Sequence, residues 1–342
     1  MLFPDNVQLQ SGHVSIVVQG PFKDATDAQG HSTISVLRSA RRYYADAEII
    51  YSGWQGAALP LEVHEFTNSI ILSTDPGPVQ TFEAETGPIV ENINRQIVST
   101  VAGLRAANRQ FAMKLRSDTL IVGNLLQPWL ERQRAKSERT TLFQLPLVAA
   151  SQYTRLFFFE YGGFRECIGH LSDLFFFGLK EDLLRFWDGP LIVPGMTQLR
   201  DRWSAATVEQ ILSIRFLVAH GGLPKEVRIH EKLAKRVGDL DWSRWTELLE
   251  SNFIVLDDDR LGVRHPLRFA RLGLSRLLFE SDSSISAARG TLGYGRLLWF
   301  YFLKIVVYLE YQMKFAMRRL LGTTRYKSFG RQVMARAARL RH

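Results

Sequence analysis

The chain alternates between short, continuous apolar runs and longer stretches with apolar residues at helical spacing. Residues 13–21 are rich in β-branched residues and end at Gly20-Pro21, which predicts a first buried strand. Ser32 or Thr33 follows as the cap of a predicted helix. Further strands are predicted at 47–54 and within 62–78, a helix at about 92–107, and another strand within 111–124.

The middle of the chain has a less regular pattern. Two aromatic strands are predicted around a glycine-containing loop, and a helix is predicted between Thr207 as its cap and Gly221 as its stop. The aromatic strands are 156–164 and 173–179, the helices are 181–187 and 206–222, and 241–259 closes the globular body.

Strands that alternate with helices in this way predict a mainly parallel sheet with helices on its faces. Ligands of such sheets bind at the carboxyl ends of the strands. We therefore expect three segments to lie on one rim: Gly20-Pro21, Ser52-Gly53-Trp54 and Asp118.

The rim contains an unusual break in an apolar strand. Arg116-Ser117-Asp118 interrupts the run before apolar residues resume, and no Gly, Pro or Asn, the usual turn residues, appears until Gly123. Because Mg²⁺ or Mn²⁺ commonly bridges phosphate oxygens to one or two carboxylates, Asp118 is a candidate anchor for a metal–nucleotide complex. The alternative is an exposed turn residue paired with Lys114 or Arg116.

Two other pairs of polar residues are candidates for binding or catalysis. Asn94 and Arg95 begin a predicted helix, where free N–H groups and the arginine fork suit a phosphate or carboxylate; the alternative is an ordinary solvated helix start. Asp173 precedes an aromatic strand and Glu209 lies early in a helix, and either could take a proton from an acceptor hydroxyl. Their alternatives are an N-cap and a first-turn helix acid.

Charge and composition separate the last part of the chain from the rest. Of the 43 Lys and Arg residues, 11 lie from Arg296 onward with a single acid, so this tail carries +10 and the remainder of the chain carries −1. The basicity therefore belongs to the tail, and nucleic acid is not an expected partner. The single cysteine excludes an internal disulfide, and the first residues lack a secretory signal pattern, so we expect a cytoplasmic protein.

The tail interleaves Trp, Tyr, Phe and Leu with Lys and Arg. Its longest apolar stretch, 297–309, is interrupted by Lys304 and is shorter than the roughly 20 residues that span a bilayer. This pattern favours a helix lying in the plane of an anionic membrane surface. The alternative is a helix packed on the body with a disordered basic end.

Several segments, in their order along the chain, resemble the WavE lipopolysaccharide synthesis family. The most telling pair is NINRQIVSTVAGL followed by KLRSD; the others are VSIVVQGP, YYADAEIIYSGW, STDPGP, SDLFFFGLKEDLLRFW and VEQ. The similarity covers about residues 13–260. The resemblance implies a glycosyltransferase A-type fold, a nucleotide-binding α/β sandwich with a mainly parallel central sheet.

In such enzymes a helix beginning near Asn-Arg leads into a strand that ends in an Asp-x-Asp motif. The matching positions here are Arg116, Ser117 and Asp118, so only the second acid is retained. By resemblance, Asp118 inherits the expectation of binding Mn²⁺ or Mg²⁺. Arg116 either contacts the diphosphate instead or indicates an enzyme with less need of metal.

The resemblance also assigns roles to the other candidate residues. We expect Gln19, Gly20 and Pro21 to line the nucleotide pocket, with Asn94 and Arg95 near the phosphates. If the reaction inverts the anomeric configuration, Asp173 is the first choice of acceptor base and Glu209 the second; a retaining reaction needs no such base.

The function implied is transfer of a sugar from a nucleotide-sugar donor to a lipid-linked lipopolysaccharide or related envelope glycan, at the inner face of the cytoplasmic membrane. We expect a transferase-like domain at 1–290 and a basic aromatic tail of amphipathic helices at 291–342. The alternative is a non-catalytic glycan- or nucleic-acid-binding protein on a degenerate transferase scaffold.

Overall fold

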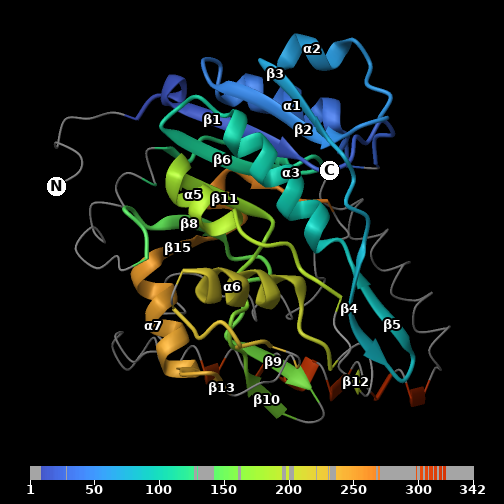
Figure 1. Cartoon of the computed structure of the whole chain (residues 1–342), viewed down its shortest axis with the longest axis vertical. Helices are drawn as coiled ribbons and strands as arrows, with labels where there is room; N and C mark the ends of the chain where they lie inside the picture. Colours follow the sequence, from blue (N-terminus) through green and yellow to red (C-terminus); the bar gives the residue numbers. More distant parts are fainter. Residues whose placement is uncertain are drawn as a thin grey trace.

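The computed structural model defines most of the α/β body and scattered positions of the tail (Figure 1). The described residues are 9–27, 29–126, 129, 142–160, 163–194, 198–199, 204–220, 222–229, 231, 236–266 and 269, with positions 298, 301–302, 305–306, 308–310, 312–313, 316–317 and 319–320 in the tail.

A seven-stranded sheet forms the centre of the body, in the order β15-β8-β11-β6-β1-β2-β3. Only β11 runs opposite to the other six strands of this sheet. The predicted mainly parallel sheet is therefore confirmed. The strands are β1 (Val14–Gln19), β2 (Glu48–Trp54), β3 (Ser69–Ser73), β6 (Phe111–Arg116), β8 (Leu147–Ala150), β11 (Phe175–Leu179) and β15 (Phe253–Leu256).

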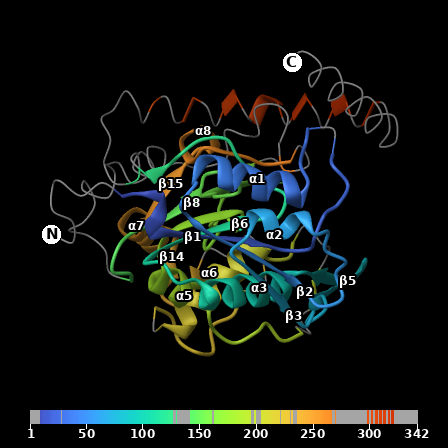
Figure 2. The same cartoon turned by 90° about the horizontal axis from the view of Figure 1, so that it is seen from above.

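Helices cover both faces of the sheet, which makes the body a three-layer sandwich (Figure 2). Side chains alternate between the two faces of β1, so Ile16 packs with α1 on one side and Val17 packs with α3 on the other. Helix α3 approaches closely because Gly103 lacks a side chain; a Cβ there would lie 2.3 Å from Val17. The helices are α1 (Thr33–Tyr43), α3 (Ile93–Ala106), α5 (Lys180–Trp187), α6 (Val208–Ala219), α7 (Trp242–Asn252) and α8 (Asp258–Leu261).

Two helix starts follow the expected capping chemistry. Of the two candidates for α1, Ser32 is the cap, and its hydroxyl accepts a hydrogen bond from the backbone N–H of Ser35. Thr207 caps α6 as part of a capping box: its hydroxyl accepts a hydrogen bond from the backbone N–H of Gln210, and the Gln210 side chain accepts one from the backbone N–H of Thr207. Helix α6 ends at Ala219, and the predicted stop at 221 lies outside the described residues.

Other predicted elements differ from the structure. Residues 62–78 contain a short helix, α2 (Glu62–Phe66), before β3, and the first aromatic stretch folds as a hairpin of two strands. A small three-stranded sheet around the β4–β5 hairpin was not predicted. The remaining elements are η1 (Ser11–His13), β4 (Val79–Ala84), β5 (Gly87–Glu91), β7 (Leu120–Ile121), β9 (Phe157–Glu160), β10 (Gly163–Glu166), β12 (Gln198–Leu199), β13 (Arg236–Val237), β14 (Leu240–Asp241) and β16 (Val263–Arg264).

The tail is described only at scattered positions, and these are helical between 298 and 320. The predicted boundary at 290 falls outside the described residues. The division into a body at 1–290 and a tail at 291–342, and the amphipathic helices of that tail, stay predictions.

Candidate functional site

The carboxyl ends of β1, β2 and β6 meet at one edge of the sheet. Gln19, the last residue of β1, is in register with Ser52 on one side and with Arg116 on the other. The structure therefore places the predicted rim segments together, because adjacent parallel strands end at the same edge.

The turn after β1 packs directly on the turn after β6. The backbone N–H of Ser117 donates to the Gln19 carbonyl at 2.8 Å, and the Ser117 hydroxyl donates to the Pro21 carbonyl at 2.8 Å. Between them, Gly20 adopts a φ of 121°, and a Cβ at that position would lie 3.1 Å from the Ser117 hydroxyl. The Gln19 side chain is buried and accepts a hydrogen bond from Ser99 at 2.8 Å.

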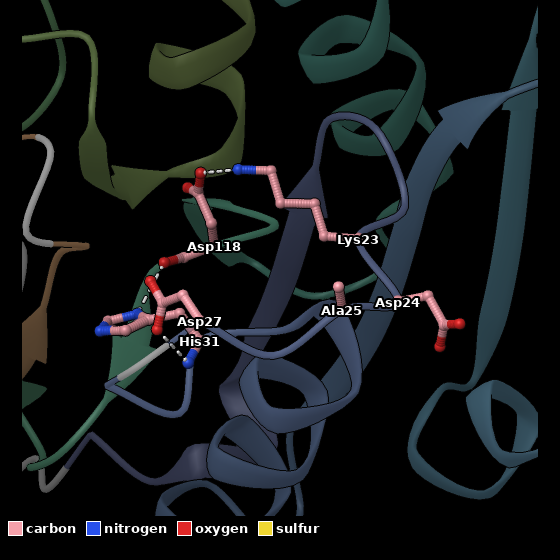
Figure 3. A pocket seen from close by; sticks show the side chains of 6 residues that line it. All are labelled: Lys23, Asp24, Ala25, Asp27, His31 and Asp118. Carbon is pink, nitrogen blue, oxygen red and sulfur yellow. Dashed lines mark hydrogen bonds and ion pairs between the residues drawn. The ribbon is translucent and has the colours of Figure 1, made fainter.

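Asp118 is 1% exposed and sits between two cations. Lys23 donates to its Oδ2, and the Nε of Arg116 lies 3.1 Å from its Oδ1. The exposed-turn alternative is therefore wrong about burial, although Arg116 is one of the partners it named. Asp118 also lines a pocket of about 360 Å³ with Lys23, Asp24, Ala25, Asp27 and His31 (Figure 3).

Asn94 and Arg95 do not line this pocket; they contact other parts of the body. The Asn94 amide makes two hydrogen bonds with the backbone of Ile192, at 2.9 and 2.8 Å. Arg95 forms a two-pronged ion pair with Asp75, at 2.7 and 2.6 Å, which lowers the pKa of that carboxyl. A role for these residues near phosphates stays a prediction.

Asp173 lies at the same edge because β11 is antiparallel to both of its neighbours, β6 and β8. Phe175 pairs with Leu115, so the residue two positions earlier lies beyond the end of β6. Asp173 is close enough that its charge acts on the pKa of Arg116 and of Glu209. The structure thus brings the two predicted acceptor bases to the same edge as Asp118 and its partner Arg116.

Glu209 lies in the first turn of α6 with its side chain 15% exposed. Burial, reinforced by the negative charge of Asp173, raises the pKa of Glu209 to about 7. Its Oε2 lies 3.9 Å from His170 Nε2, and the charge of Arg155 acts on it in the opposite direction. A carboxyl with this pKa can accept or release a proton near neutral pH.

Lys114 lies within the site and was not predicted as a functional residue. Its side chain is fully buried, its ammonium donates to the carbonyl of Asp173, and it lies 4.8 Å from the Trp187 ring centroid. Burial lowers the pKa of Lys114 to about 7, although the charge of Asp173 acts in the other direction. The available signal was a lysine inside the apolar strand FAMKLR.

Tyr153 is another residue that sequence reasoning missed, as it missed Lys23. It is the one non-glycine residue with a positive φ, 70°, in the part of the chain that the structure describes. Such strain persists where the surroundings enforce it, often at binding sites. Its ring faces Arg155 at 5.6 Å and Phe269 at 6.2 Å, and Arg116 stacks on Phe269 at 4.8 Å.

Comparison with protein-family models finds a match that covers most of the chain. Residues 14–299 match the family model described as WavE lipopolysaccharide synthesis. The chain belongs to this family. Membership places it in lipopolysaccharide synthesis and confirms the resemblance seen in its sequence. No curated protein matches the chain.

The solved structures that are similar to this member of the WavE family include two at 8–10% identity. A mannose-1-phosphate geranyltransferase from Thermus thermophilus matches with 10% identity and a TM-score of 0.29, over 51% of this chain and 59% of that one. A 4-diphosphocytidyl-2C-methyl-D-erythritolsynthase from Anaerococcus prevotii matches with 8% identity and a TM-score of 0.28, over 62% of this chain and 98% of that one. At these scores neither likeness supports an argument about function.

The residues around Asp118 do not fit a divalent metal as they stand. Both carboxylate oxygens already accept hydrogen bonds from Lys23 or Arg116. Within the described residues, no group of three or more His, Cys, Asp or Glu side chains could hold a metal ion. Mg²⁺ is usually bound through one or two carboxylates together with substrate phosphates and waters, and here both oxygens of the one carboxylate are already paired with cations.

Among the residues that the structure describes, no helix is both long and apolar enough to cross a membrane.

The buried ammonium of Lys114 predicts a pH dependence of stability. Its pKa is about 7 in the folded chain and 10.5 when exposed, so between these values the unfolded chain binds one more proton. The free energy of unfolding should therefore gain a component that rises with pH from 7 to 10.5, with a limiting slope of about 1.4 kcal/mol per pH unit. Lys114→Met should lack this component in urea unfolding at about pH 7 to 10.

Lys180→Met is the matched control, because Lys180 is partly exposed and its backbone N–H bonds to Gln110 at the opposite edge of the sheet. An unchanged pH dependence in Lys114→Met, beside an unchanged control, would contradict the buried-cation assignment.

Proposed function

We propose that this chain is a glycosyltransferase that moves a sugar from a nucleotide-sugar donor to a lipopolysaccharide or related envelope glycan. One observation carries the proposal. Asp118 is buried to 1% and still lines a pocket at the edge where β1 and β6 end. Membership of the WavE family supports the class of acceptor.

In the proposed reaction, the acceptor hydroxyl oxygen bonds to the anomeric carbon of the donor. The bond between that carbon and the diphosphate oxygen breaks, and its electron pair leaves with the diphosphate. The hydroxyl proton passes to Asp173, or to Glu209 as the second choice, if the configuration inverts. Positive groups beside Asp118 stabilise the charge that develops on the leaving group.

The proposal is tested by a thermal-shift screen of common sugar nucleotides, with and without Mn²⁺, followed by a donor hydrolysis assay. We expect one donor to raise the melting temperature and to be cleaved slowly without acceptor. No shift and no cleavage with any donor would instead favour a non-catalytic glycan-binding module.

We further propose that the tail lies on the anionic inner face of the cytoplasmic membrane, where the lipid-linked acceptor is expected. Leu298, Ile305, Leu309 and Met313 are 69%, 57%, 56% and 65% exposed, and their spacings of 7, 4 and 4 put them on one face of a helix. The +10 charge from Arg296 onward complements anionic lipid.

The double variant Ile305→Asp and Leu309→Asp should weaken binding to phosphatidylglycerol-containing vesicles by at least about tenfold, because two apolar side chains can no longer enter the interface. The control is Leu61→Asp, since Leu61 is 85% exposed but belongs to the body. Vesicle flotation measures both variants, and equal binding of the double variant and the wild type would remove the anchor.

A further inference from the structure

The ion pairs at Asp118 have a definite orientation. The Asp118 side chain is 2% exposed, whereas the side chains of Lys23 and Arg116 are 29% and 22% exposed. The carboxylate is therefore the least exposed member of this cluster, and each of the two cations presents more of its side chain to solvent. A ligand that approaches this edge meets the cations before it meets the acid.

The other acids of the pocket do not reverse this arrangement. Asp27 accepts hydrogen bonds from the backbone N–H groups of Gln29 and His31, at 2.9 and 3.0 Å, so one of its oxygens is committed to the turn. Asp24 points away from Asp118 (Figure 3). His31 lies against the Asp118 carbonyl, with its Nδ1 at 3.0 Å.

We infer that Lys23 and Arg116, held in place by Asp118, bind the donor's diphosphate directly and that the donor binds without a divalent metal. This inference rests on the proposed glycosyltransferase function. An ammonium and a guanidinium form strong, charge-assisted hydrogen bonds to phosphate oxygens. Arg116 is further oriented by its stacking on Phe269 at 4.8 Å.

Asp118 then has a different task from the acid of an Asp-x-Asp motif. Its two oxygens hold the Lys23 ammonium and the Arg116 guanidinium beside each other. Because the two side chains are already ordered, binding a phosphate costs less conformational entropy. The first acid of the motif is replaced by Arg116, so the motif position supplies positive charge instead of a metal ligand.

The direct test measures binding of nucleoside diphosphates to the full chain in EDTA and in Mn²⁺. UDP, GDP, CDP, ADP and dTDP are screened by thermal shift, and the dissociation constant of the best one is measured by calorimetry. We expect binding in EDTA, with a dissociation constant within about threefold of the value in Mn²⁺. Mn²⁺ alone is expected to leave the melting temperature unchanged.

A variant tests whether the Lys23 side chain binds the nucleotide. Lys23→Met should weaken nucleotide binding about 10- to 100-fold, the effect of losing one charge-assisted hydrogen bond. Lys180→Met removes a lysine at the opposite edge of the sheet and should bind like the wild type. The melting temperature without nucleotide checks that each variant is folded.

The outcomes separate this inference from the proposed function. Binding that requires Mn²⁺ would overturn the inference and leave the glycosyltransferase proposal in place. Wild-type affinity in Lys23→Met would likewise overturn it. Failure of every nucleotide in both conditions would remove the proposed function and, with it, the inference. The comparison of EDTA and Mn²⁺ uses the wild-type chain, so it stands even if a variant does not fold.

Discussion

Replacing Asp118 by Asn is expected to lower the rate of sugar transfer by about 100-fold while leaving the chain folded. Asparagine has the same shape but cannot form ion pairs with Lys23 and Arg116. The two cations then lose the anchor that holds them at this edge of the sheet, so the leaving diphosphate is less well stabilised. Initial rates of donor consumption measure the loss, and circular dichroism checks the fold.

The control for this variant is Asp24→Asn. Asp24 lines the same pocket but points away from Asp118, so its replacement should change the rate little (Figure 3). A folded Asp118→Asn protein with wild-type turnover would remove Asp118 from the site. Loss of activity is expected whether or not a metal binds. This variant therefore tests whether Asp118 belongs to the active site, and the comparison of EDTA with Mn²⁺ tests whether the donor needs a divalent metal.

The fold was predictable where local chemistry alone decides it. The glycine-proline stop after β1, the cap at Ser32 or Thr33 and the Thr207 cap each depend on residues close in sequence, and each prediction agrees with the structure, where Ser32 is the first cap. The hairpin of β4 and β5 was missed, because its strands pair outside the main sheet and no alternation of strand and helix points to them.

The site was only partly predictable, because its contacts join segments far apart in the chain. Asp118 could be singled out from the broken apolar strand, but its partner Lys23 lies 95 residues earlier. That pairing depends on β1 and β6 being neighbours, which only the strand order reveals. For the same reason Asn94 and Arg95, although at a helix start, meet Ile192 and Asp75 instead of the pocket.

The position of Asp173 illustrates how strand direction decides the edge of the sheet at which a residue lies. In an all-parallel sheet, a residue just before a strand lies at the edge opposite to the ligands. Because β11 is antiparallel to β6 and β8, its first residues lie at the ligand edge instead. The sequence indicated a carboxylate before a strand, but it did not indicate that this strand is antiparallel to its neighbours.

On the acceptor side of the reaction, the largest loss of transfer rate is expected from replacing one of the two carboxyls, Asp173 or Glu209. If the reaction inverts, replacing the base with its amide should lower the transfer rate about 10²- to 10⁴-fold, while nucleotide binding persists. Asp173→Asn is expected to show this loss. Glu181→Gln is the control, since Glu181 is exposed on α5 at the other edge.

The pH profile assigns the role of Glu209. Its pKa is raised to about 7, so it is protonated below that pH and ionised above it. A base must be ionised, so if Glu209 takes the proton, kcat/KM of the wild type should rise through about pH 7 and Glu209→Gln should lose both this rise and the activity. If Asp173 takes the proton, Glu209→Gln should keep measurable transfer while Asp173→Asn does not. Wild-type transfer in both variants, with retention of the anomeric configuration by NMR, would show that neither carboxyl is needed as a base.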